Sequence, residues 1–172
     1  VDIFLLVTYL LIALVFSFLC SVFEAVLLSI RRPYIATQKE SNPRNSEVWG
    51  KLTRDINRPL SAILILNTVA HTVGAAGVGG QAMTIFGDAP LTMGIISAVL
   101  TLLILILSEI IPKTLGAVFW KQLAPITGKM LSAFTRVMSP LIWMTEKITS
   151  GISHGEKKGA YSRAEFIAMA DI

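Results

Sequence analysis

The sequence predicts an all-α membrane protein with three transmembrane helices, followed by helices that lie in the cytoplasmic interface. Of its 172 residues, 53% are hydrophobic and 15% are charged, and the mean hydropathy is +0.68, which is too apolar for a soluble domain of this size. Three apolar stretches are long enough to cross a bilayer, and the basic residues cluster between and after them. The net charge of +4 therefore follows membrane topology and does not indicate nucleic-acid binding.

The first span is expected at about residues 3–30, which contain no Lys or Arg. It lacks the basic start and the cleavage site of a signal peptide, so we expect a retained helix. Ser17, Ser21 and Glu24 are spaced i, i+4 and i+7, which places them within an arc of about 60° on one helix face. Two hydroxyls beside a carboxylate attract cations, although serines in membrane helices also bond their own backbone or a neighbouring helix.

Residues 31–58 are polar and rich in Lys and Arg, so the positive-inside rule makes them a cytoplasmic loop and places the N-terminus outside. A surface helix is expected within this loop at 46–57. The second span, at about 59–80, carries Asn67 and His71 on one helix face. Asn67 offers a neutral oxygen ligand, whereas His71 suits a hydrogen bond between helices, a transition metal or a proton relay.

Small residues follow His71 in the same span. The pairs Ala75/Gly79 and Ala76/Gly80 have the spacing that lets two helix backbones approach closely. They are one reason to expect a homodimer.

The third span, at about 91–113, holds a carboxylate and a proline. A carboxylate at the bilayer centre costs roughly 2.5–3.5 kcal/mol on insertion scales, so Glu109 should face protein or water and have a partner. Pro112 lacks an N–H and leaves the carbonyl of Ser108 without its usual donor. This arrangement is either half of a site for a hard cation or a proline kink beside a proton-bound Glu109. Lys113 marks the expected cytoplasmic end of the span.

The rest of the chain is amphipathic and then polar. Residues 117–150 contain no basic-free stretch long enough to span a bilayer, so we expect interfacial helices, broken near Pro125 and Pro140, in preference to a fourth span. Residues 151–172 should begin a cytoplasmic soluble segment that continues past the last residue, with a capping box at Ser162 and Glu165. The three-span domain itself is expected to end near residue 116.

Together the spans predict a site made of oxygen atoms. Octahedral coordination by oxygen is what Mg²⁺ requires, and a dication would remove the repulsion between two carboxylates. If His71 joined the site, Mn²⁺, Co²⁺ or Zn²⁺ would fit better than Mg²⁺. The predicted ligands are Ser17, Ser21, Glu24, Asn67, Ser108 through its carbonyl, and Glu109.

These residues resemble the signature of the CorC and cyclin M family of magnesium transporters, over residues 3 to about 116. The resemblance implies a homodimer of three-helix protomers in a bacterial inner membrane, which exports Mg²⁺ with a Na⁺ gradient as the proposed driving force. It also implies nucleotide-binding regulatory domains after residue 172. Members often carry Gly where this chain has Ser108, so the carbonyl and the hydroxyl of Ser108 both remain candidate ligands. The matching stretches are Phe16–Ser17, Ser21–Ala25, Asn67 and Ser108–Lys113, and the implied Mg²⁺ ligands are Ser17, Ser21, Glu24, Asn67 and Glu109.

We therefore expect a Mg²⁺ transporter that works by alternating access around a midplane site, with Pro112 as the hinge. The alternative is a membrane sensor or scaffold in which the ion is structural and a cytoplasmic region outside this chain carries the activity. Enzymatic activity is not expected, because the chain has neither a His-Glu-x-x-His nor a Gly-x-Gly-Asp motif. Its expected partners are a second copy of itself, the bilayer and Na⁺.

Overall fold

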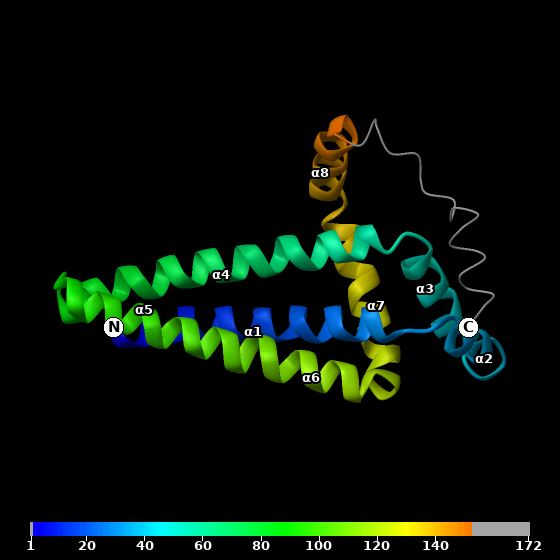
Figure 1. The fold of residues 1–172 in the computed structure, drawn as a ribbon, viewed down its shortest axis with the longest axis horizontal. Helices are drawn as coiled ribbons and strands as arrows, with labels where there is room; N and C mark the ends of the chain where they lie inside the picture. Colours follow the sequence, from blue (N-terminus) through cyan, green and yellow to red (C-terminus); the bar gives the residue numbers. More distant parts are fainter. Residues whose placement is uncertain (1, 153–172) are drawn as a thin grey trace, which may run out of the picture. The chain divides into compact units, whose positions relative to one another are not determined.

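The computed structural model of this chain describes residues 2–152, and every regular element in that range is a helix. The all-α class is therefore confirmed. The capping box predicted at Ser162 and Glu165 lies outside the described residues. In chain order the elements are α1 (Asp2–Ser29), α2 (Arg32–Ser41), α3 (Pro43–Arg54), α4 (Asn57–Phe86), α5 (Pro90–Leu103), the π-helix η1 (Ile104–Ile110), α6 (Ile111–Val118), α7 (Trp120–Val137) and α8 (Ser139–Ile152) (Figure 1).

Three of these helical stretches are long and apolar enough to cross a membrane, as the sequence predicts. They are α1, α4 and the continuous stretch Pro90–Val118, which comprises α5, η1 and α6. Large apolar side chains such as Phe4, Leu64 and Leu102 are exposed on them, as contact with lipid tails requires. The protein is thus a multi-pass membrane protein. Its third span continues past Lys113 to Val118, so Lys113 lies within a helix and not at its end.

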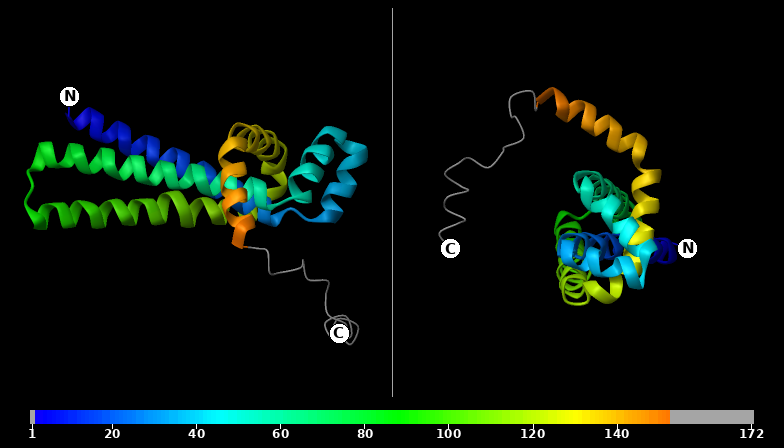
Figure 2. Two further views of the ribbon diagram at one scale, coloured as in Figure 1. Left: turned by 90° about the horizontal axis from the view of Figure 1, so that it is seen from above. Right: turned by 90° about the vertical axis from the view of Figure 1, so that its right-hand side faces the viewer.

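Helix α1 packs against both other spans, against α4 and against η1 and α6, as Figure 1 shows. Toward its N-terminus α1 diverges from α4 and α5, which lie side by side (left view of Figure 2). Glycines allow the approach of α4: Gly74 packs on Ala13, and a Cβ at Gly77 would lie 2.6 Å from the ring of Tyr9. A Cβ at Gly79 would meet nothing within 4 Å in this chain. The small-residue pairs that include Gly79 and Gly80 therefore do not form the α1–α4 contact.

A tight turn joins the second and third spans. Helix α4 ends at Phe86 and is capped by Gly87, whose φ of 78° lies in the left-handed region that glycine adopts without strain. Pro90 then opens α5 at a position where its missing N–H has no helical partner to lose. The turn makes α4 and α5 neighbours.

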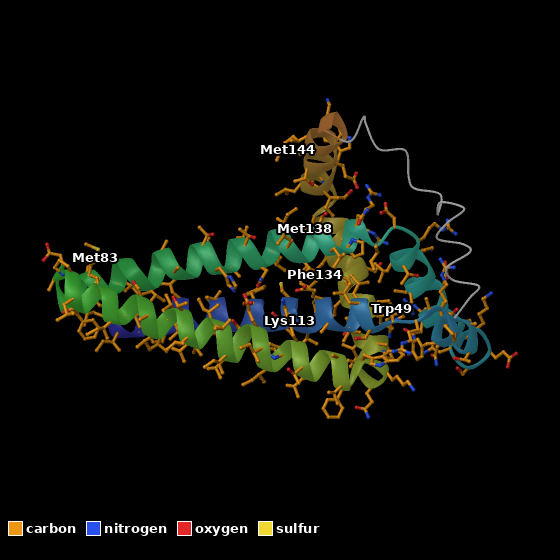
Figure 3. The ribbon with its side chains drawn as sticks, in the orientation of Figure 1. Trp49, Met83, Lys113, Phe134, Met138 and Met144 are labelled. Carbon is orange, nitrogen blue, oxygen red and sulfur yellow. The ribbon has the colours of Figure 1, made fainter. Side chains whose placement is uncertain are left out.

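The helices α2, α3 and α7, called here the juxtamembrane helices, lie at one end of the spans, where α7 packs against α1 and α4, and α3 packs against α2 and α7. Trp49 on α3 is fully buried, and its indole N–H donates to the carbonyl of Ala124 at 3.0 Å (Figure 3). The break predicted near Pro125 is wrong, because α7 runs through this proline from Trp120 to Val137. The buried packing of Ala124 and Leu131 accounts for this, since tertiary contacts outweigh one lost backbone hydrogen bond.

The compact unit that contains α8 is separate from the unit formed by residues 1–138. Within α8, Pro140 is the second residue, so a helix boundary does fall near this proline. The ammonium of Lys147 lies 5.1 Å from the centre of the Trp143 ring, a cation–π contact on one helix face.

Candidate functional site

The polar face of α1 is buried against the neighbouring spans. Ser17 and Ser21 are 0% and 1% exposed. The hydroxyl oxygen of Ser17 lies 2.6 Å from Nε2 of His71 on α4, within hydrogen-bonding distance. This contact joins the first and second spans in the apolar part of the helices.

The third span contributes Glu109 at the same place. Its Oε1 atom lies 4.0 Å from Nε2 of His71, so two side chains, from the first and third spans, converge on one imidazole nitrogen of the second. The predicted need of Glu109 for a polar neighbour is met by His71. No sequence motif links Glu109 with His71. The two residues are far apart in the chain, and their contact depends on how the spans pack.

One helical turn away, two oxygens lack partners. Helices α1 and α4 are antiparallel, so four residues forward from Ser17 and four residues back from His71 lead to the same level. Ser21 and Asn67 occupy this level, and their Oγ and Oδ1 atoms are the buried side-chain oxygens without a hydrogen-bond partner in the described part of the chain. Because an unpaired buried polar atom costs about 1–3 kcal/mol, both oxygens are suited to a ligand such as a hard cation.

Glu24 forms an ion pair that the sequence did not predict. The Nζ atom of Lys113 on α6 lies 3.2 Å from Oε2 of Glu24, and both side chains are partly exposed. A carboxylate within a membrane span needs a partner, and this rule is the feature of the sequence that could have indicated the pair of Glu24 and Lys113. From the sequence alone, Lys113 is expected at the cytoplasmic end of the third span.

The third span is a π-helix where it carries Ser108 and Glu109. The N–H of Ile111 bonds to the carbonyl of Ile106, five residues earlier, immediately before the buried Pro112. The sequence predicted a proline kink here but not the wider helix, which is typical of functional sites. Ser108 is 0% exposed, and its hydroxyl donates to the carbonyl of Ile104 at 2.7 Å. The lone pairs of that hydroxyl remain available to a cation.

The composition of the site favours a hard cation. In residues 2–152 there is no group of three or more His, Cys, Asp and Glu side chains that could hold a metal ion. The side chains gathered at the candidate site offer hydroxyl and amide oxygens together with two carboxylates. Mg²⁺ accepts such ligands and keeps part of its water shell, whereas structural zinc sites use Cys and His.

Comparison with known proteins places this arrangement in a family context. The family model described as the cyclin M transmembrane N-terminal domain matches residues 7–172. The UPF0053 protein sll1254 of Synechocystis is 32% identical over 161 residues, which cover 94% of this chain and 46% of that protein. The UPF0053 inner membrane protein YfjD of Escherichia coli is 28% identical over 126 residues, which cover 73% of this chain and 29% of that protein. This chain thus spans less than half the length of the curated relatives described.

Proposed function

This chain belongs to the cyclin M transmembrane domain family, and from that premise we propose that it exports Mg²⁺ across the membrane. The observation that supports the proposal best is the pair of buried oxygens without partners, Ser21 Oγ and Asn67 Oδ1. Along α1, Ser21 lies between Ser17 and Glu24, and Ser17 is at the same depth as Glu109 because both contact His71. A cation bound at the depth of Ser21 would therefore lie between the carboxylates of Glu109 and Glu24 along the membrane normal.

The proposed ligands combine charge with neutral oxygens. Glu24 and Glu109 supply two negative charges, which balance a divalent ion and favour it over an uncharged solute. The neutral oxygens replace water molecules that Mg²⁺ releases reluctantly, so several are needed. They belong to Ser17, Ser21, Asn67 and Ser108.

We assign the movement of the ion to the third span. Pro112 removes one backbone hydrogen bond, and the π-helix directly before it has an irregular bonding pattern. Both features make this segment the natural hinge for alternating access around a fixed site. A Na⁺ gradient is the proposed driving force.

We also propose that the protein works as a homodimer in the inner membrane of a bacterium, with its N-terminus outside. The basic loop at residues 31–58 supports this orientation through the positive-inside rule. The printed name of the Escherichia coli relative places that protein in the inner membrane.

Calorimetric titration of the purified protein with Mg²⁺, Ca²⁺ and Mn²⁺ tests the site. Saturable Mg²⁺ binding should disappear in the double variant Glu24→Gln, Glu109→Gln while the protein stays folded. Proteoliposomes with an internal Mg²⁺ dye then test transport, with and without a Na⁺ gradient. Binding without flux would favour the sensor or scaffold, and the absence of specific binding in a folded protein would refute the proposed Mg²⁺ site.

A further inference from the structure

Lys113 carries a charge near the proposed site, and the proposed function gives this side chain no role. Its ammonium lies 3.2 Å from the carboxylate of Glu24, and Figure 3 shows it beside α1. The two helices meet closely here, since a Cβ at Gly116 would lie 2.8 Å from Cβ of Ala25. The pair is therefore built into the contact between α6 and α1.

The partner of this ammonium is itself part of the proposed site. A charged side chain in a membrane span needs a counter-charge or water. The ammonium of Lys113 contacts Glu24, one of the proposed Mg²⁺ ligands.

One carboxylate cannot serve both cations at full strength. A Mg²⁺ ion binds carboxylate oxygens at about 2.0–2.1 Å and repels an ammonium on the same group, because the two positive charges would lie only a few ångströms apart. The ammonium must then leave Glu24, or the ion must bind without this ligand.

We propose that Lys113 is a tethered counter-ion that neutralises Glu24 while no divalent ion is bound and is displaced when one binds. This inference rests on the proposed Mg²⁺ site. With Lys113 on Glu24, the two carboxylates and the ammonium carry a net charge of −1, and displacement of the ammonium exposes −2.

The exchange makes Lys113 a specificity-determining residue. A Na⁺ ion that displaces the ammonium replaces one positive charge by another and gains no Coulomb energy from the exchange. A Mg²⁺ ion brings two charges to the same oxygens and gains from both carboxylates. Because the ammonium is held by the chain at high effective concentration, it excludes monovalent ions more effectively than divalent ones.

The test is calorimetric titration of Mg²⁺ into the purified protein and its Lys113→Met variant, at low and at high NaCl. Removal of the competing charge should tighten Mg²⁺ binding by about tenfold, a modest coupling for a close charge pair. High NaCl should weaken Mg²⁺ binding to Lys113→Met much more than to the unchanged protein. If Lys113→Met does not fold, Lys113→Gln takes its place, and the same changes in Mg²⁺ affinity are expected.

Two controls make the result specific. Lys121→Met removes a charge from α7 whose ammonium lies 5.6 Å from the centre of the Trp120 ring, and it should leave the affinity unchanged. In the Glu24→Gln background, Lys113→Met should no longer tighten binding, because the two residues act as a pair.

The outcomes separate this inference from the proposed function. If the unchanged protein binds Mg²⁺ but Lys113→Met binds it equally or more weakly, Lys113 is a structural partner of Glu24 and the inference is wrong. If neither folded protein binds Mg²⁺, the proposed site itself fails, and the inference fails with it.

Discussion

Glu109 places a carboxylate 4.0 Å from the imidazole of His71 in the most polar part of the spans. Glu109→Gln keeps the shape of this side chain and removes its charge. Loss of a charged ligand should weaken Mg²⁺ binding by about 30-fold or more, since interactions with a charged group contribute about 2 kcal/mol. Calorimetric titration measures the change, with Glu47→Gln in α3 as a control for the loss of a carboxylate elsewhere. Equal affinity in Glu109→Gln and the unchanged protein would remove Glu109 from the site.

We expect His71 to influence which divalent ions the proposed site accepts. Its Nε2 atom faces both Ser17 and Glu109, at 2.6 and 4.0 Å, so a small shift would add an imidazole to the ligand set. Imidazole favours Co²⁺ and Mn²⁺ over Mg²⁺. The variant His71→Asn replaces the ring by an amide, and we expect the ratio of Co²⁺ to Mg²⁺ affinity to fall by about tenfold.

Competition between the two ions in one titration measures this ratio directly. Asn45→Ala, which changes a buried polar residue of α3, is the matched control and should leave the ratio as it is. A ratio that is unchanged in His71→Asn would confine His71 to its hydrogen bond with Ser17.

At the scale of whole elements, the contact between α3 and α7 depends on a small residue. A Cβ at Gly128 would lie 2.9 Å from Nε1 of Trp49, the atom that donates to Ala124. Gly128→Ala should therefore lower the free energy of unfolding by about 1–3 kcal/mol, the usual cost of overpacking a core.

The matched control for this change is Gly50→Ala in α3, where an added Cβ meets nothing within 4 Å. That substitution should raise stability by about 0.4–1 kcal/mol, because alanine has fewer unfolded conformations than glycine. Thermal unfolding in detergent compares the two variants. A loss of stability in both, or in neither, would contradict the packing seen at Trp49.

Some features of these helices could be predicted from the sequence alone. Apolar length and charge distribution predicted the three spans, because the bilayer imposes a minimum length on any helix that crosses it. The i, i+4 spacing of Ser17 and Ser21 predicted one shared face, and both are buried. These features depend only on local geometry.

Contacts between elements could not be predicted in the same way. Gly74 and Gly79 are both small residues of α4, yet Gly74 packs on α1 and Gly79 does not, because only the packing of the spans distinguishes the two faces. Likewise, the charge of Lys113 suits a span end as well as an ion pair with Glu24, and the structure shows the pair. The π-helix was missed because no residue type specifies it; Pro112 indicates only that the helix is irregular there.

For the molecule as a whole, the direction of transport has meaning only once the orientation of the spans in the membrane is known. We expect Asp88, in the turn after α4, to face the outside, and Ser41, at the end of α2, to face the cytoplasm. Cysteine labelling tests this directly, since Cys20 is buried and can be replaced by Ala to give a cysteine-free background.

In intact cells, a membrane-impermeant maleimide should label Asp88→Cys and should label Ser41→Cys only after the membrane is made permeable. Both side chains are exposed in the structure, so accessibility in the folded protein does not bias the comparison. The opposite pattern would invert the topology, and the Lys113 end of the third span would then lie nearer the outside. Export by the proposed mechanism would require Mg²⁺ to enter the site from the end of the bundle that carries the juxtamembrane helices, so the labelling result decides whether that end faces the cytoplasmic pool of Mg²⁺.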